Sequence, residues 1–409
     1  MNWEFSTLKP RHLKSLQAVS SKFTKKVDFV SSRNMPLTTN LNINKNNNFF
    51  ELIISEQEST NKTIAAFFTI EKLDEIFLLD LIFLNKNLES TWQEIIIEKT
   101  YDFIVEKFKL NEFTLEINGF TSLTNLPFEN WWKIDENTYK IIVKSYKFID
   151  IHSHPFAEYY DNSEKEVENC FANSIDKMVI VGTSWEDIQE VTELSKKWKN
   201  TYNIIGIHPS NIQENEDYSK LEKFINEKTI GIGEIGLDTY HKTNLELALQ
   251  ISAMDKQIEI AKKHNLVVMF HIRDQNINET TNLELTQDKI KKNPNINFVF
   301  HNYSAPIGLL EKFKDLPNIY FSFSGVATFK NSYDIRQAIE QLPLNKILIE
   351  TDAPYLSPEP NRGLWPNSSI EIKQVYQKIA FIKGISKKDL SEIIQNNFEF
   401  VFGRKLIKN

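Results

Sequence analysis

Eight short apolar runs, rich in β-branched residues, recur along the second part of the chain, and patterns typical of helices separate them. Strands that alternate with helices favour an α/β fold with a parallel sheet. The expected strands are Phe148–Ile151, Met178–Gly182, Ile204–Ile207, Thr229–Gly233, Leu266–Phe270, Asn297–Phe300, Ile319–Ser322 and Lys346–Glu350. The clearest helical patterns are Trp185–Trp198, Leu245–His264 and Tyr333–Gln341. Eight such units in about 260 residues fit a TIM-like (β/α)8 barrel, and a doubly wound open sheet is the alternative.

The first part of the chain has a different character. A length of 409 residues exceeds one average domain. Only Gly119 lies before residue 148, whereas the other ten glycines follow. Seven of the eight histidines also lie in the second part. We therefore place a boundary near residue 146, with a smaller α+β domain over residues 1–146 and the barrel over residues 147–409.

The smaller domain is expected to combine helices with a sheet. The patterns predict helices at Lys9–Ser20 and Thr91–Leu110, a loop at Asn40–Asn48, and strands at Phe49–Ser55, Thr63–Ile70, Glu75–Leu84, Glu112–Ile117 and Thr138–Lys144. This order resembles the GNAT acyltransferase fold, in which a glycine-rich turn cradles the pyrophosphate of coenzyme A. The corresponding turn here, Leu84–Ser90, contains no glycine. The resemblance thus implies a degenerate domain, and we expect no coenzyme A binding.

Charge and composition exclude several classes of protein. The net charge of −7 argues against binding of nucleic acid through bulk electrostatics. No run of about 18 apolar residues is present, so no membrane span is expected. The single cysteine, Cys170, excludes an intramolecular disulfide and a multi-cysteine zinc site. A reducing, cytoplasmic location is the simple expectation.

Polar residues able to bind metal follow most of the expected barrel strands. They are His152, His154, Glu234, His271, His301 and Asp352. Parallel barrel strands end at one rim, so these side chains should converge there. A single polar residue at a strand end is more often structural, but His152 and His154 share one face of an extended chain. Buried without partners, six such groups would be costly. The set therefore predicts a metal site.

The motifs around these residues are similar to those of the TatD family of metal-dependent hydrolases. They read FIDIHSHP at 148–155, GIHPSN at 206–211, GIGEIGLD at 231–238, HIRDQ at 271–275, HNYS at 301–304 and ETDAPYLSPEPNRG at 350–363. The resemblance implies two divalent ions, Mg²⁺, Mn²⁺ or Zn²⁺. It implies that His152, His154 and Asp352 hold one ion, that His271 and His301 hold the other, and that Glu234 bridges them.

The resemblance also implies a metal-dependent deoxyribonuclease that cleaves phosphodiester bonds in single-stranded DNA or frayed ends. Glu234 and Asp352 would be catalytic. Arg273, His208 and Tyr303 would contact the substrate, with a salt bridge, a structural cap and a packed aromatic side chain as the respective alternatives. The chain departs from the family pattern where Leu364-Trp365-Pro366 stand as an apparent insertion.

Two other functions stay open at this point. The same metal chemistry would serve a deacylase or amidohydrolase that acts on an ester or amide, such as an aminoacyl-tRNA. A non-catalytic scaffold that kept the barrel is the third possibility, and the complete ligand set argues against it.

Overall fold

The computed structural model describes residues 2–7, 47–55, 62–73, 76–83, 97, 100, 101, 104, 112–118, 131–133, 138–142, 147–276, 281–305 and 307–406. The chain divides into two compact units, Met1–Ser145 and Tyr146–Asn409. Among the described residues, no helix has the length and apolar content needed to cross a membrane.

The first unit contains a seven-stranded sheet. Its strands are β1 (Asn2–Thr7), β2 (Asn47–Ser55), β3 (Lys62–Leu73), β4 (Ile76–Phe83), β5 (Glu112–Asn118), β6 (Trp131–Lys133) and β7 (Thr138–Ile142), in the order β1-β2-β3-β4-β5-β7-β6. Only β4 and β5 pair in parallel. Strands β2, β3, β4, β5 and β7 lie where the sequence patterns predict strands.

The helix expected before β5 is described at four positions. Ile97, Thr100, Tyr101 and Ile104 are helical and buried, with the spacing of one helix face. The expected loop at Asn40–Asn48 ends earlier than predicted, because Asn47 and Asn48 already belong to β2. The expected helix Lys9–Ser20 and the turn Leu84–Ser90 lie outside the described residues. The acyltransferase resemblance and the absence of coenzyme A binding therefore stay predictions.

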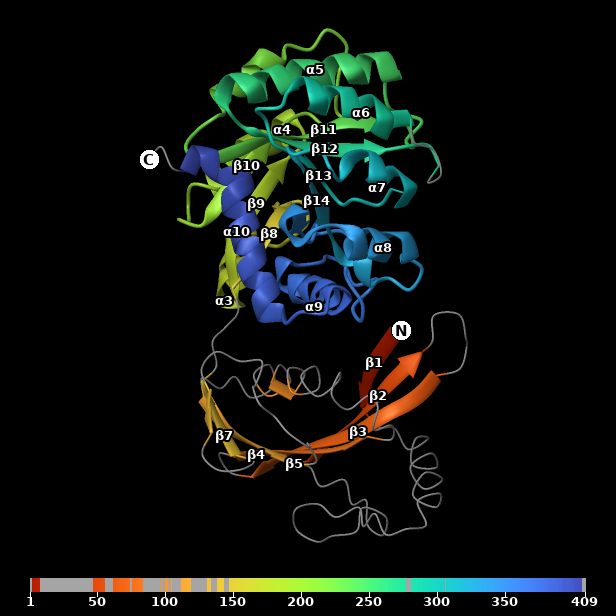
Figure 1. Cartoon of the computed structure of the whole chain (residues 1–409). Helices are drawn as coiled ribbons and strands as arrows, with labels where there is room; N and C mark the ends of the chain where they lie inside the picture. Colours follow the sequence, from red (N-terminus) through yellow and green to blue (C-terminus); the bar gives the residue numbers. More distant parts are fainter. Residues whose placement is uncertain are drawn as a thin grey trace. The chain divides into compact units, whose positions relative to one another are not determined.

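The second unit is an eight-stranded parallel barrel of the TIM and amidohydrolase type (Figure 1). Its strands are β8 (Phe148–Ser153), β9 (Ile175–Gly182), β10 (Thr201–Ile205), β11 (Thr229–Asp238), β12 (Val267–Arg273), β13 (Phe298–Phe300), β14 (Ile319–Phe323) and β15 (Ile347–Ile349). Each overlaps one expected strand, and neighbours in sequence are neighbours in space. A parallel bridge between Ser153 and Ala353 joins the first strand to the segment after the last. The barrel prediction is thus confirmed, and the open-sheet alternative is wrong.

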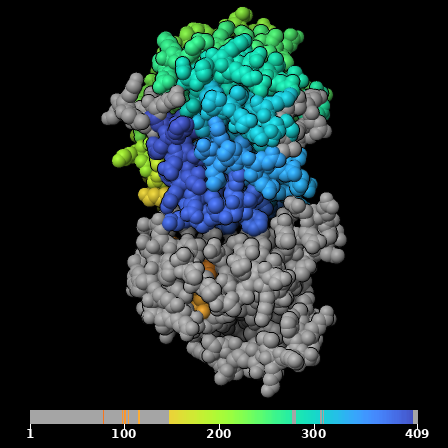
Figure 2. Space-filling model, viewed as in Figure 1, coloured from red at the N-terminus to blue at the C-terminus, as the bar shows by residue number. Residues whose placement is uncertain are grey.

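Helices surround the strands. They are α3 (Ser163–Ala172), α4 (Trp185–Leu194), α5 (Leu247–His264), α6 (Thr281–Lys292), α7 (Ile307–Phe313), α8 (Tyr333–Gln341), α9 (Ile372–Lys383) and α10 (Lys387–Leu406), with short 3-10 turns η3 (Tyr218–Lys223), η4 (Gly325–Thr328), η5 (Leu344–Lys346) and η6 (Ser369–Glu371). Local signals explain their ends: the Ser184 side chain caps α4, and α9 stops at Gly384, whose φ is 65°. In Figure 2 the C-terminal helices, in blue, cover one face of the barrel.

Strand β11 is shaped to present a side chain at the rim. All ten of its residues are buried, and its register with β12 shifts between Ile232 and Ile235. A bulge of this kind re-aims a side chain. A Cβ at Gly233 would lie 2.6 Å from the Cβ of Met269, so only glycine permits this close approach to β12. The next residue, Glu234, lies beside the shift.

Candidate metal centre

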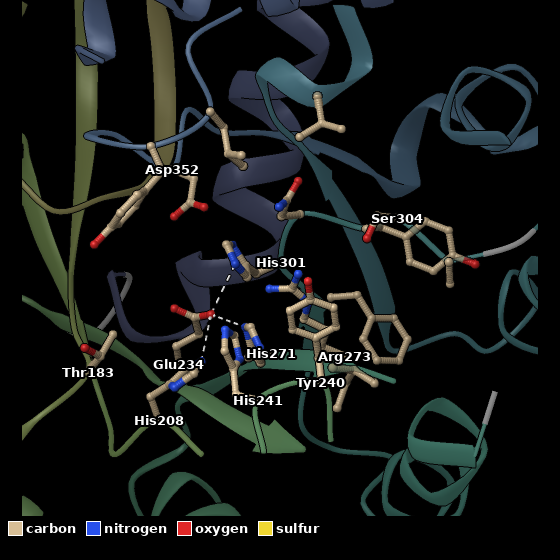
Figure 3. A pocket seen from close by; sticks show the side chains of 18 of the residues that line it. Thr183, His208, Glu234, Tyr240, His241, His271, Arg273, His301, Ser304 and Asp352 are labelled. Carbon is tan, nitrogen blue, oxygen red and sulfur yellow. Dashed lines mark hydrogen bonds and ion pairs between the residues drawn. The ribbon is translucent and has the colours of Figure 1, made fainter. Parts of the chain in front are cut away.

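The six predicted ligand residues converge at the carboxyl ends of the barrel strands. They come from β8 (His152), β11 (Glu234), β12 (His271) and the segments after β8 (His154), β13 (His301) and β15 (Asp352). All but His152 line a cavity of about 750 Å³, which lies in the usual range for ligand sites. Figure 3 shows Glu234 in the middle, with contacts to His208, His271 and His301.

His152, in β8, and His154, directly after it, direct ring nitrogens at one point. Nδ1 of His154 lies 2.8 Å from the carbonyl oxygen of Val181, and Nδ1 of His152 lies 3.1 Å from Sδ of Met269. Since these partners only accept, both protons belong on Nδ1. The two Nε2 atoms, 3.1 Å apart, then both carry lone pairs. Oδ1 of Asp352 lies 3.6 Å from each of them.

Glu234 joins the two sides of the cluster. Its Oε1 lies 2.7 Å from Nδ1 of His271 and 3.2 Å from Nε2 of His301, and its Oε2 lies 3.4 Å from Nε2 of His152. Burial favours the neutral acid, but the charge of His301 and the hydrogen bonds of His271 and His301 hold the pKa of Glu234 well below its usual value. Glu234 is therefore a carboxylate.

Two buried carboxylates behind the histidines were not predicted. Oδ2 of Asp238 lies 3.1 Å from Nε2 of His271, and Oε1 of Glu350 lies 2.9 Å from Nδ1 of His301. Such carboxylates orient an imidazole and set its tautomer. Burial disfavours the charged ring of His301, yet Glu234 and Glu350 hold its pKa well above the usual value. Their only signal in the sequence is their place inside GIGEIGLD and ETDAPYL.

A third unpredicted carboxylate, Asp150, ties β8 to the end of β15. It accepts hydrogen bonds from the backbone nitrogens of His152 (3.2 Å) and Thr351 (3.0 Å) and from the Thr351 hydroxyl (2.5 Å). Burial raises the pKa of Asp150 to about 7, although these hydrogen bonds act in the opposite direction. Asp150 therefore fixes the two segments that carry His152 and Asp352.

The cluster fits divalent cations. His152, His154 and Glu234 offer three ligand atoms within 4.8 Å of one another. Glu234, His271 and His301 offer three more, so Glu234 belongs to both groups. The facing lone pairs of His152 and His154 repel each other unless a proton or a cation lies beside them. Mixed imidazole and carboxylate donors suit zinc, manganese or magnesium.

Two predicted substrate residues line the cavity beside this cluster. The guanidinium carbon of Arg273 lies 3.7 Å from the ring centroid of Tyr240, so the charge is held over an aromatic face. Nε2 of His208 lies 3.9 Å from Oε1 of Glu234. Burial and the neighbouring His271 lower the pKa of His208 to about 3, so its ring is neutral. The carboxylate next to Arg273 in the sequence, that of Asp274, accepts a hydrogen bond from the backbone nitrogen of Asn282.

Tyr303 lines the same cavity, but its side chain is only 4% exposed. Its ring packs against Phe300, Phe321 and Phe323 with centroid distances of 6.2, 5.0 and 6.3 Å. The ring therefore lacks an open face on which a base would stack. This packing matches the alternative interpretation of Tyr303 as a packed aromatic residue.

A parallel barrel that gathers imidazoles and carboxylates at the carboxyl ends of its strands is typical of metal-dependent hydrolases. The family model for TatD related DNases matches residues 149–403. The chain belongs to this family and is a metal-dependent hydrolase.

Relatives and solved structures agree with this assignment. An uncharacterised metal-dependent hydrolase of Bacillus subtilis (strain 168), YabD, is 30% identical over 62% of this chain and 98% of its own length. Another, MG009 of Mycoplasma genitalium, is 34% identical over 63% of this chain and 99% of its own. The crystal structure of YJJV, a TatD homologue from Escherichia coli K12, covers 64% of this chain and 99% of its own, with 23% identity and a TM-score of 0.56. At 23% identity, the similarity to YJJV shows that the two proteins share a fold.

Proposed function

We propose that the protein is a metal-dependent deoxyribonuclease that hydrolyses phosphodiester bonds in single-stranded DNA or frayed ends. The observation that carries this proposal is the position of Glu234 between two groups of imidazoles, which suits a carboxylate shared by two cations. The name of the family supports DNA as the substrate.

In this proposal His152, His154 and Asp352 would hold one ion, His271 and His301 would hold the other, and the carboxylate of Glu234 would serve both. The ions would be Mg²⁺, Mn²⁺ or Zn²⁺. When bound, they would lower the pKa of a water molecule and polarise a phosphoryl oxygen. Asp238 and Glu350 would keep the ligand atoms of His271 and His301 pointed into the site.

The chain's own groups then have distinct tasks. Asp352 lies at the cavity, and although burial favours its neutral form, the neighbouring histidines His154, His301 and His152 hold its pKa below the usual value. An ionised Asp352 is able to accept the proton of the attacking water. Arg273 would pair with a non-bridging phosphate oxygen. His208, with a neutral ring, would donate a hydrogen bond without adding charge.

The test is hydrolysis of a labelled single-stranded oligonucleotide by the purified protein, beside hydrolysis of an aminoacyl ester. We expect cleavage of DNA with Mg²⁺, Mn²⁺ or Zn²⁺, no cleavage in excess EDTA, and recovery when the cation is restored. Hydrolysis of the ester alone would instead support the deacylase. Among the described residues, we find no feature that favours the deacylase over the nuclease. Full activity in EDTA would contradict metal dependence. The cytoplasmic location stays a prediction.

A further inference from the structure

Three aromatic side chains, Tyr159, Tyr355 and Trp365, form a cluster that we name the aromatic platform. Ring centroids lie 5.9 Å apart for Tyr159 and Tyr355, 6.0 Å for Tyr159 and Trp365, and 5.4 Å for Tyr355 and Trp365. The Tyr355 hydroxyl donates to that of Tyr159 over 3.0 Å. Tyr355 is 41% exposed and Trp365 is 59% exposed, so large ring surfaces meet solvent. Exposed aromatic clusters of this kind mark binding sites.

The platform begins at the candidate metal centre. The ring of Tyr355 lies 6.4 Å from that of His154, and Tyr159 and Tyr355 line the same cavity as Glu234 and Asp352. Trp365 does not line the cavity but packs on both tyrosines. The aromatic surface therefore runs from the candidate ligands, through two tyrosines that line the cavity, to the solvent-exposed Trp365.

The loop that carries Tyr355 and Trp365 is anchored by hydrogen bonds. The buried amide of Asn367 donates to the carbonyl oxygen of Tyr355 (2.7 Å), and its backbone nitrogen donates to Pro354 (2.8 Å). The Tyr160 hydroxyl donates to the carbonyl oxygen of Asn367. The Ser357 hydroxyl donates to the carbonyl oxygen of Leu364 over 2.6 Å. Trp365 is thus held in place while its ring stays exposed, so binding on it orders little extra chain.

The platform is suited to flat, uncharged groups, because none of its three side chains carries a charge. The cavity beyond it holds the cation ligands and Arg273, which suit an anionic group. We infer that the aromatic platform is a stacking subsite for an unpaired nucleobase next to the phosphodiester to be cleaved. This inference rests on the proposed nuclease function and names the part of the substrate that decides specificity. Bases inside a duplex are stacked on both faces by their neighbours, whereas an unpaired base can turn a face to the platform, so single-stranded ends would be favoured.

The first experiment compares the variant Trp365→Ala with the wild-type protein on two oligonucleotides of equal length. One carries normal bases, and the other carries abasic residues on both sides of the cleavage site. We expect KM for the normal oligonucleotide to rise about 5- to 100-fold, the range for loss of one stacked base, with kcat little changed. KM for the abasic oligonucleotide should stay as in the wild type.

Two further variants control for structure. Trp365→Phe keeps a ring face and should restore most of the affinity. Phe400→Ala removes another exposed aromatic ring, which lies on α10, is 67% exposed and does not line the cavity. This variant should leave KM unchanged for both oligonucleotides. An equal loss on both oligonucleotides in Trp365→Ala, or no loss on either, would overturn the inference while leaving the nuclease proposal intact.

A binding measurement separates the two proposals. In EDTA, thymidine oligonucleotides should quench the tryptophan fluorescence of the wild type, and Trp365→Ala should lose this quenching. Quenching that depends on Trp365, without cleavage when cations are added, would support base stacking on the platform and contradict the nuclease proposal. Cleavage, with quenching that persists in Trp365→Ala, would support the nuclease proposal and contradict the stacking subsite.

Discussion

The candidate metal centre has two sides that are built differently. On one side, which we call the closing seam, the ends of β8 and β15 meet, and these ends with the residues that follow them supply His152, His154 and Asp352. On the other, which we call the opposite wall, β11 and β12 supply Glu234 and His271. Both sides place a buried carboxylate behind the ligands: Asp150 at the seam, and Asp238 at the wall.

At the closing seam the same residues hold the candidate ligands and close the barrel. The backbone nitrogen of Asp352 donates to the carbonyl oxygen of His152 (2.9 Å), and that of His154 donates to Ala353 (2.7 Å). Asp150 adds hydrogen bonds to the backbone and hydroxyl of Thr351. Because little regular pairing joins these segments, side-chain hydrogen bonds contribute directly to closure.

At the opposite wall the backbone is held independently of the functional side chains. Strands β11 and β12 are paired along their length: Gly231 lies opposite Val267 at one end, and Asp238 lies opposite Arg273 at the other. The buried side chain of Gln250 accepts from the backbone nitrogen of Asp238 (2.8 Å) and donates to its carbonyl oxygen (3.1 Å). The comparison teaches that activity and stability should be coupled at the seam and separable at the wall.

The largest effect is expected from Glu234→Gln, since Glu234 contacts both sides. The amide keeps the size but removes the charge that two cations need, so hydrolysis of single-stranded DNA should fall by at least about 1,000-fold. The melting temperature should change little. Glu259→Gln, the same change at a side chain that is 67% exposed on α5, is the matched control and should leave both quantities unchanged. Near wild-type turnover of a folded Glu234→Gln protein would contradict the proposal that two cations share the carboxylate of Glu234.

Asp150→Ala tests the coupling at the seam. The change leaves the buried backbone nitrogen and hydroxyl of Thr351 without their acceptor, which should lower the free energy of unfolding by about 2–4 kcal/mol. The melting temperature should fall by about 5–15 °C. Activity should fall as well, because His152 and Asp352 lose their alignment. A stable Asp150→Ala protein with full activity would show that backbone pairing alone closes the barrel.

Asp238→Ala tests the separation at the wall. Its carboxylate contacts His271 and accepts from the backbone of Tyr240 and His241, but Gln250 still holds the strand. Activity and cation affinity should fall about 10- to 100-fold, as for other carboxylates behind metal-binding histidines. The free energy of unfolding should fall by only about 1 kcal/mol. Calorimetric titration with Zn²⁺ and a denaturant melt measure the two effects. A larger stability loss here than in Asp150→Ala would reverse the comparison.

The smallest effect is expected from Arg273→Ala. Arg273 is exposed at the end of β12 and stacks on Tyr240, away from the hydrogen bonds that hold either side together. KM for an oligonucleotide should rise about 3- to 10-fold, which is the contribution to binding expected from one partly exposed charge-assisted hydrogen bond. The kcat and the stability should stay close to those of the wild type. Steady-state kinetics at several salt concentrations check this. A large fall in kcat at unchanged KM would place Arg273 at the reacting phosphate.

Much of the barrel could be predicted because its signals are local. Runs such as Met178–Gly182 and Ile319–Phe321 contain no charged or strongly polar side chain, as is usual for strands buried on both faces. The sequence pattern places the ends of the strands less accurately than their centres. The apolar pattern of the fourth strand breaks at Glu234, yet β11 continues to Asp238. A polar residue inside a strand interrupts the pattern without ending the pairing.

The supporting carboxylates could not be predicted in the same way. Asp238 and Glu350 stand beside predicted ligands in their motifs, but nothing in the sequence states that each faces a histidine from another strand. Tyr303 shows how packing bears on a predicted substrate contact. It follows a ligand at a strand end, where a contact with substrate is reasonable, and yet the neighbouring strand β14 brings Phe321 and Phe323 against its ring.

The sequence by itself determined the strands, their order and the chemical types at their ends, because hydrophobic periodicity and motif spacing are properties of short segments. Only the tertiary structure decided which groups share a neighbour. Glu234 and His301 are far apart in the chain, and the register of β11, β12 and β13 brings them to 3.2 Å. The pairing of β11 with β12 also seats Asp238 behind His271. The segment after β15 brings Glu350 behind His301, and β14 covers Tyr303. Contacts between strands depend on register and on bulges such as that beside Glu234, and these arise only when the whole barrel closes.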